Sequence, residues 1–130
     1  MSVVINGSTG INTIEPTIVP AALSASGSAP VYAARAWVNF NGTGTVAIRA
    51  SGNVSSITDN GTGDYTVNFT NAMTDVNYSV SLLDGEQGDI GNYYGSAASN
   101  LTTTSVKANV FRTDSFARID RNYVSLAIFR

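Results

Sequence analysis

The chain has 130 residues, and Ser, Thr, Asn and Gly fill 54 of these positions, about 42% of the total. Charged residues make up 12% and the formal net charge is −2, so a general electrostatic attraction to nucleic acid is not expected. The absence of His and Cys excludes imidazole and thiolate metal sites, disulfides, haem ligation and Ser-His or Cys-His nucleophile pairs.

The balance of residue types predicts an all-β protein. Val, Ile and Thr number 36, against five Leu, two Glu, one Gln and one Lys, and β-branched side chains favour strands whereas straight ones favour helices. The hydrophobic fraction of 43% suffices for one core and therefore for one domain with an arm. No apolar run is long enough to span a membrane, and residues 1–20 lack a signal-peptide pattern. We expect synthesis in a cytoplasm and no membrane insertion.

Residues 1–30 differ from the rest because they hold all three prolines and only one charged residue. Proline fixes φ and removes backbone donors, which predicts an extended arm. A short strand at Val3 and Ile5, followed by an Asn6-Gly7 turn, fits this segment. Its apolar residues suit a groove on another body, or alternatively a place on the chain's own domain. The candidate anchoring residues are Val3, Ile5, Ile11, Ile14, Ile18 and Val19.

From residue 31 onward, apolar and small polar residues alternate with a period of two. Such alternation indicates strands with one buried face. The strands are expected at residues 36–40, 46–50, 65–69, 78–82, 106–110 and 124–128. Turn-forming clusters separate them at residues 41–44, 51–53, 59–64 and 71–77. This spacing predicts an antiparallel β-sandwich, jelly-roll-like, over residues 31–130, with no helix longer than one or two turns.

Two segments outside this pattern are predicted loops. Residues 84–104 form the longer one, and loops of this length in compact domains are usually functional or packed on a neighbour. Within it, Asn92, Tyr93 and Tyr94 are a candidate receptor contact, because adjacent tyrosines stack on sugars or contact proteins at low entropic cost. Alternatively, one tyrosine fills the core. A surface glycan is therefore a possible partner.

The second loop, residues 113–122, is rich in charge. Aromatic residues alternate with arginines around it, as in single-strand nucleic-acid platforms, but its aspartates leave too little positive charge for that role. Arginine pairing with carboxylates across a subunit interface is favoured instead. The candidate interface charges are Arg112, Asp114, Arg118, Asp120 and Arg121.

Other motifs carry no chemistry that we expect to be used. The G-x-G-x-x-A match at residues 42–47 leads into a strand pattern, so a hairpin turn is favoured over a phosphate site. Acidic residues at 59, 64, 84, 86 and 89 lack a calcium-loop spacing, which favours turn capping over metal binding. No acid, base and nucleophile constellation emerges. We expect no cofactor, no metal and no enzymatic activity.

Residues 33–51 read AARAWVNFNGTGTVAIRAS, and residues 54–69 read VSSITDNGTGDYTVNF. Together they resemble a module that recurs in tail fibres and other virion-surface proteins of tailed bacteriophages. Residues 77–80 and 124–130 are similar to the same module. The chain lacks the repeated shaft of a long fibre, which favours a short appendage, a fibre-tip component or a capsid-decorating protein.

The resemblance implies a non-enzymatic structural protein on the virion surface, most simply a homotrimer in contact with other virion proteins. Half-polar strand faces, such as Thr66 with Asn68 or Ser79 with Ser81, suit packing against identical copies and suit water equally well. A host-receptor or carbohydrate-binding module that uses residues 84–100 is the alternative. Tail and capsid locations both stay open, as do the host and the receptor.

Overall fold

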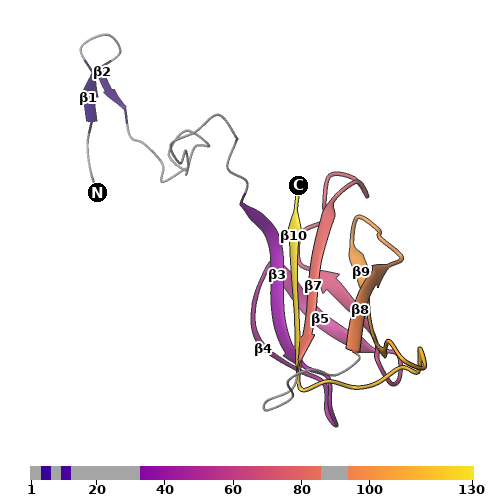
Figure 1. The fold of residues 1–130 in the computed structure, drawn as a ribbon. Helices are drawn as coiled ribbons and strands as arrows, with labels where there is room; N and C mark the ends of the chain where they lie inside the picture. The colour runs from indigo at the N-terminus through magenta and orange to yellow at the C-terminus, as the bar shows by residue number, and fades with distance from the viewer. Residues whose placement is uncertain (1–3, 7–9, 13–32, 86–93) are drawn as a thin grey trace. The chain divides into compact units, whose positions relative to one another are not determined.

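A computed structural model of the chain describes residues 4–6, 10–12, 33–85 and 94–130. The chain divides into two compact units, Met1–Tyr32 and Ala33–Arg130, and Figure 1 shows the strands of each. In the first unit, β1 (Val4–Asn6) pairs antiparallel with β2 (Gly10–Asn12), so that Ile5 lies opposite Ile11. The predicted short strand around Ile5 is confirmed, whereas Val3, Gly7 and most of the expected arm fall outside the described residues.

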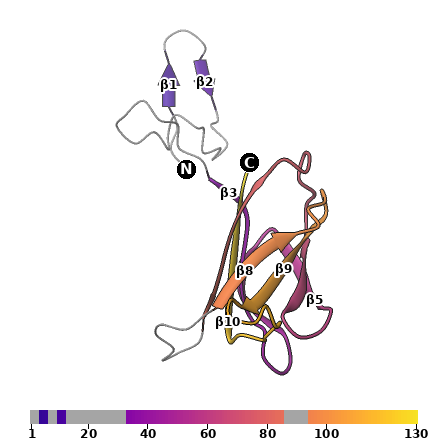
Figure 2. The same ribbon diagram turned by 45° about the vertical axis from the view of Figure 1, so that its right-hand side comes forward.

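The second unit is built from two four-stranded antiparallel sheets. The first sheet has the order β4-β3-β10-β7, formed by β4 (Ala47–Gly52), β3 (Ala34–Asn41), β10 (Tyr123–Phe129) and β7 (Ser79–Gly85). The second has the order β5-β6-β9-β8, formed by β5 (Val54–Asp59), β6 (Asp64–Phe69), β9 (Ser105–Arg112) and β8 (Tyr94–Ser99). Figure 2 shows β8, β9 and β5 in one layer, with β10 and β3 in the other.

The predicted fold class is confirmed: the protein is all-β, and residues 33–130 form an antiparallel β-sandwich with no helix among the described residues. Alternate side chains of each central strand enter the space between the sheets, because successive residues of a strand point to opposite faces. The fully buried side chains include Phe40, Tyr65, Val67, Val106, Val110, Val124 and Ile128. The rings of Phe40 and Tyr65 meet edge to face, with centroids 5.2 Å apart.

The inward face predicted for residues 46–50 is largely wrong. Val46 packs against the core, but Ile48 and Ala50 are exposed on the edge strand β4. Ile48 lies opposite the buried Phe40 and is exposed because β4 is an edge strand. The register shifts between Asn39 and Phe40 of β3, and this shift accounts for Ala50 alone. Such a bulge changes the phase of the strand pairing, and a change of one residue moves a side chain to the other face. Ala50 therefore pairs with the outward-facing Asn39.

The predicted loop over residues 84–104 is wrong at its first two residues and at residues 94–99, whereas residues 100–104 do form a connection. β7 continues to Gly85, and Tyr94–Ser99 forms β8, which pairs with β9 along its whole length. β8 has the sequence YGSAAS, whose small residues do not show the alternation of apolar and polar side chains that marks a strand. β5 was also absent from the predicted strands. Both are edge strands, whose formation depends on the neighbour with which they pair rather than on their own propensity.

Three connections meet at one end of the sandwich: residues 42–46, 60–63 and 113–122. We call it the loop end. The last connection was predicted with these same bounds, and it links β9 to β10. Contacts between the connections hold them together, since the Gly42 amide donates to the Arg121 carbonyl (2.9 Å) and the Val110 amide donates to the Gly63 carbonyl (2.9 Å).

Candidate functional site

The loop end contains a buried hydrogen-bonded group centred on Tyr65. Its hydroxyl donates to the Gly42 carbonyl at 2.9 Å or to Asp120 Oδ1 at 2.7 Å. The same carboxylate oxygen accepts the Gly63 amide at 2.8 Å. One core tyrosine thus connects the three loop-end connections. Burial, with the neighbouring Asp120 carboxylate adding to it, raises the pKa of Tyr65 well above its ordinary value.

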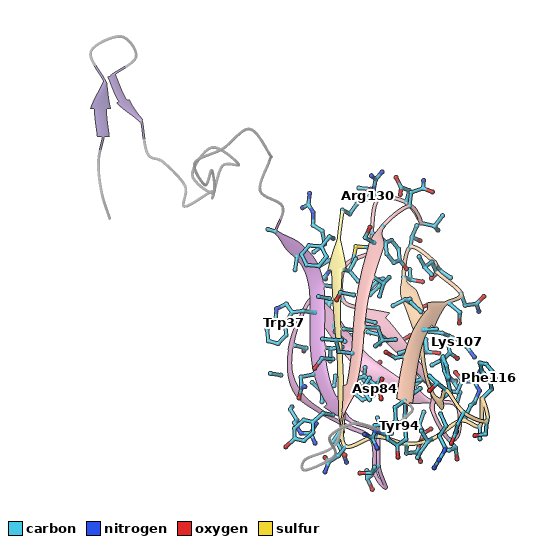
Figure 3. All side chains as sticks on the ribbon, viewed as in Figure 1. Trp37, Asp84, Tyr94, Lys107, Phe116 and Arg130 are labelled. Atoms are coloured by element: carbon cyan, nitrogen blue, oxygen red, sulfur yellow. The ribbon has the colours of Figure 1, made fainter. Side chains whose placement is uncertain are left out.

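Beside this group lies a buried ion pair. Arg121 Nε is 3.8 Å from Asp84 Oδ2, and the two side chains are 4% and 7% exposed. The guanidinium also lies over the ring of Tyr94, 3.9 Å from its centroid, a cation–π contact. Figure 3 labels Asp84 and Tyr94 toward the same end of the sandwich. The pair connects β7, β8 and the residues that lead into β10, so its role in the described part of the chain is to hold elements of both sheets together.

The remaining charges of the loop end lie nearer to water. Arg112 contacts Asp114 through two hydrogen bonds of 3.1 and 2.8 Å. Donation from the Arg112 guanidinium, and then from the Ser115 hydroxyl, lowers the pKa of Asp114 to about 2. Lys107 Nζ and Arg118 face the two oxygens of Asp64 at 3.2 and 3.6 Å. Arg118 also donates to the Gly63 carbonyl (3.1 Å).

The five candidate interface charges all have partners within their own chain. Arg112 contacts Asp114, Arg118 faces Asp64, Asp120 accepts from Tyr65, and Arg121 faces Asp84. The sequence shows these groups in one short segment and favours partners on another subunit. Their participation in a subunit interface stays a prediction.

The candidate receptor contact is divided between described and undescribed residues. Asn92 and Tyr93 lie outside the described residues. Tyr94 begins β8, and its half-buried side chain contacts Arg121 and lies 5.9 Å from Arg112. Among the candidate anchoring residues, Ile5 and Ile11 pair in the first unit. The others, Val3, Ile14, Ile18 and Val19, lie outside the described residues.

The turn interpretation is confirmed for residues 42–47 and for Asp59. It is wrong for Asp84, which lies in β7 and faces Arg121. Residues 86 and 89 lie outside the described residues. Residues 42–46 connect β3 to β4, so a strand and not a helix follows the glycines. Asp59 caps the next turn by accepting the Gly61 amide (2.9 Å). In the described ranges, no three metal-binding side chains of the His, Cys, Asp and Glu types come together. Within the same ranges, no helix has the length and apolarity to cross a membrane.

An open cleft of about 450 Å³ lies at the other end of the sandwich, between Arg35 and Arg130. Its cations are already engaged within the chain. Arg130 pairs with Asp75, and the Arg35 Nε–H donates to the Arg130 carbonyl at 3.0 Å. Asn53, with a positive φ of 56°, also bridges this end by donating to the Arg35 and Asn71 carbonyls. These contacts join the chain segments at this end of the sandwich, and they leave both arginines engaged rather than open to an anion.

The comparisons with known proteins were negative. No protein-family model, curated protein or solved structure matches this chain. The candidate site therefore rests on the geometry of the second unit alone.

The outward face of β3, β10 and β7 is unusually apolar. Four of the seven large hydrophobic residues that are exposed in the described chain lie there: Trp37, Leu83, Tyr123 and Phe129. We call these residues the apolar face. No carboxylate points outward from these three strands, because Asp84 is turned inward to Arg121. Arg49 borders the face, with its guanidinium 4.5 Å from the Tyr123 ring centroid.

The middle of the apolar face is hollowed. A groove of about 240 Å³ runs between Trp37, which is 44% exposed, and Leu83, which is 69% exposed. Its floor consists of small side chains: Ser81, Ser125 and Ala127. Trp37 lies flat on Gly52 of the neighbouring strand, where an added Cβ would come within 2.4 Å of the indole nitrogen. Figure 3 shows Trp37 projecting away from the sandwich on the side opposite Phe116.

The alternation of residues 36–40 predicts Trp37 on the outward side of its strand, but no local pattern predicts the apolar face. The four residues are distributed over 93 positions of the chain. They share one sheet face only because β10 lies between β3 and β7, with Tyr123 and Phe129 at the two ends of β10. The one signal in the sequence was the low charge of the strands, which is consistent with a surface that is covered in an assembly.

Proposed function

We propose that this chain is a non-enzymatic structural protein of a tailed-bacteriophage virion, a short tail-fibre-like or capsid-decorating surface protein. In this proposal, residues 1–30 anchor it to other virion proteins, and the sandwich associates with copies of itself as a homotrimer. The observation that supports it most is the apolar face. Exposed apolar side chains gathered on one face of a small domain mark a contact surface, and burying what stays exposed of them in an assembly stabilises the contact.

Two further observations support the proposal. The residues that carry the resemblance to virion-surface modules, 33–69, fold into β3, β4, β5 and β6 of the sandwich. The loop-end carboxylates Asp64, Asp84, Asp114 and Asp120 each face a donor within the chain. Their contacts stabilise the loops, which suits a structural role. The trimeric state itself comes from the resemblance.

Trp37 offers a direct test of self-association, because it is the chain's single tryptophan. We expect sedimentation of the full chain to show a trimer at high concentration, and dilution to shift the tryptophan emission to longer wavelength as the apolar face becomes exposed. The Leu83→Ser variant should dissociate at higher concentration than the wild type while keeping its β-sheet circular dichroism.

Val76→Ser is the matched control, because Val76 is 47% exposed but lies in the β6–β7 connection, outside the apolar face. It should leave association unchanged. A monomer at every concentration, with tryptophan emission independent of dilution, would contradict self-association through this face. In purified virions, a low copy number per particle would place the protein on the tail, and a high one on the capsid.

A further inference from the structure

Phe116 combines a strained backbone with an exposed aromatic ring. Its φ is 56°, in the left-handed region, and the residue is 78% exposed. For a residue with a Cβ this conformation costs roughly 1–2 kcal/mol. The Phe116 side chain is too exposed for its burial to offset that cost. The turn fixes the conformation, since the Phe116 amide donates to the Arg112 carbonyl (2.8 Å) and the Arg112 amide donates to the Ala117 carbonyl (2.9 Å). Strain held by surrounding structure is a reason to look for a function.

The Phe116 ring has a second aromatic residue beside it. It stacks on Phe111 of β9, with the centroids 6.3 Å apart and the planes inclined by 27°. Phe111 points outward opposite Gly95 of β8, where an added Cβ would come within 3.2 Å of the ring. The glycine therefore lets the Phe111 ring lie close to the sheet. The two rings form one wall of an open pocket of about 360 Å³.

Polar side chains form the rest of this pocket, together with Ala97. Asn109 donates to Ser99 Oγ (2.8 Å) and to the Ala97 carbonyl (3.1 Å), and Arg118 donates to Asn109 Oδ1 (2.7 Å). Beyond the pocket, the same sheet face also carries hydrogen-bonded amide and hydroxyl groups, since Asn68 donates to the Ser56 and Thr58 hydroxyls. Hydroxyl and amide groups thus border the aromatic wall.

The charges near the pocket largely balance one another. Arg118 and Lys107 both face Asp64, so the charge of the Arg118 guanidinium is already partly neutralised. The same guanidinium donates to the Gly63 carbonyl and to Asn109 Oδ1. The pocket therefore offers aromatic rings, hydroxyls and an amide, but little free charge. The centre of a protein contact is typically sealed from water, whereas this pocket is open. A sugar ring presents C–H faces for stacking on the aromatic wall and hydroxyls at its edges for the polar side chains and for water.

We propose that the Phe111–Phe116 pocket binds a neutral oligosaccharide. One sugar ring stacks on the exposed face of Phe116, and its hydroxyls hydrogen-bond to Asn109 and Ser99. Small-molecule sites commonly combine an apolar wall with a few oriented polar groups. The site lies on the β5-β6-β9-β8 sheet, away from the apolar face and distinct from the predicted contact at residues 92–94. It goes beyond the structural role and does not depend on trimer formation.

The full chain can be tested on an array of immobilised neutral and acidic oligosaccharides, followed by saturation-transfer NMR with the neutral oligosaccharide that binds best. We expect transfer to the protons of one sugar ring. Phe116→Asn should weaken binding about tenfold or more, as for an exposed aromatic anchor. Because asparagine tolerates a positive φ, this variant should keep or raise the melting temperature, which separates loss of binding from loss of fold.

Phe129→Asn is the matched control, since Phe129 is an exposed phenylalanine of the opposite sheet. It should leave sugar affinity unchanged, whatever it does to association measured by sedimentation. The proposal is overturned if no neutral oligosaccharide binds, if only acidic ones bind, or if Phe116→Asn binds as tightly as the wild type. Binding of a protein partner at Phe116 in place of a sugar would overturn it as well.

Discussion

At the scale of single residues, the loop end shows how polar groups are tolerated inside a small sandwich. Tyr65 places its ring in the core and its hydroxyl between Gly42 and Asp120. Arg121 and Asp84 are buried as a pair, with Tyr94 against the guanidinium. The Tyr65 hydroxyl is hydrogen-bonded, and the buried carboxylate and guanidinium face each other, which lowers the cost of burying them.

Removing one member of the buried ion pair should be much more harmful than removing both. Arg121→Met leaves the Asp84 carboxylate buried without its counter-charge, and we expect a loss of about 3–5 kcal/mol in the free energy of unfolding. The double variant with Asp84→Leu should recover most of that loss. Urea denaturation of the two single variants and the double variant gives the coupling energy. Additive effects would show that the pair makes no specific contribution.

Tyr65 should make the protein sensitive to alkali. Its folded pKa is raised above the ordinary value of 10.0, so the folded state favours the neutral phenol. The stability that this group contributes is complete below pH 10 and is lost as the pH rises above it. Urea midpoints measured between pH 8 and pH 11 should therefore fall at the alkaline end.

Tyr65→Phe provides the control for this pH dependence. Without the hydroxyl, the variant loses its bonds to Gly42 and Asp120 and should be less stable at pH 8 by about 1–2 kcal/mol. The difference between the two proteins should shrink above pH 10. A constant difference across the whole range would show that Tyr65 titrates normally. Tyr78, whose pKa burial also raises, leaves some alkaline slope in both proteins.

At the scale of elements, the turns decide how closely the sheets and connections approach one another. Gly63 ends the β5–β6 turn in the left-handed region with a φ of 60°. A Cβ there would meet the Val110 carbonyl at 2.3 Å and the Ile119 amide nitrogen at 2.8 Å. The glycine thus permits the turn to pack directly against β9 and the connection that follows it.

Gly63→Ala should destabilise the protein far more than Gly44→Ala. The two glycines have nearly the same φ, 60° and 62°, but nothing lies within 4 Å of a Cβ at Gly44. We expect about 1–2 kcal/mol for Gly44→Ala from the backbone conformation alone. For Gly63→Ala, the clash with backbone atoms should raise the loss to about 3 kcal/mol or more. Equal losses, measured by thermal unfolding, would show that the close approach is unimportant.

Sequence periodicity identified the central strands better than the edges. β3, β6, β9 and β10 alternate buried and outward residues, as predicted. The edge strands β5 and β8 were missed, because their formation depends on the strands with which they pair. The burial predicted for residues of β4 was largely wrong, because β4 is an edge strand with a bulge in its pairing. In the candidate site, the charged cluster at residues 112–121 was found. The Arg121 partner Asp84 was not, because it is distant in sequence and comes close only when β7 pairs with β10.

At the scale of the whole molecule, the main feature is the division of the chain into two units, Met1–Tyr32 and Ala33–Arg130. Residues 33–130 contain the complete two-sheet core. A domain with its own core should fold without the preceding residues. The anchoring role of the first unit is a proposal, and it can be separated from folding by truncation.

Deleting residues 1–29 should leave a folded sandwich that no longer joins the virion. We expect its urea midpoint to match that of the full chain within about 0.5 kcal/mol, because the core is unchanged. Incorporation is measured by mass spectrometry of purified particles after complementation with the full or truncated chain. Continued incorporation of the truncated protein would contradict the anchoring role, and an unfolded truncated protein would contradict the independence of the sandwich.

The sequence by itself determined that this protein is an all-β sandwich with alternating buried residues, because composition and a period of two act within each strand. Only the tertiary structure decided which surfaces and sites exist. Trp37 and Leu83 meet on one face because β10 lies between their strands, and Phe116 is exposed because a turn holds its backbone in the left-handed region. Such features depend on contacts between distant segments, which local residue patterns do not specify.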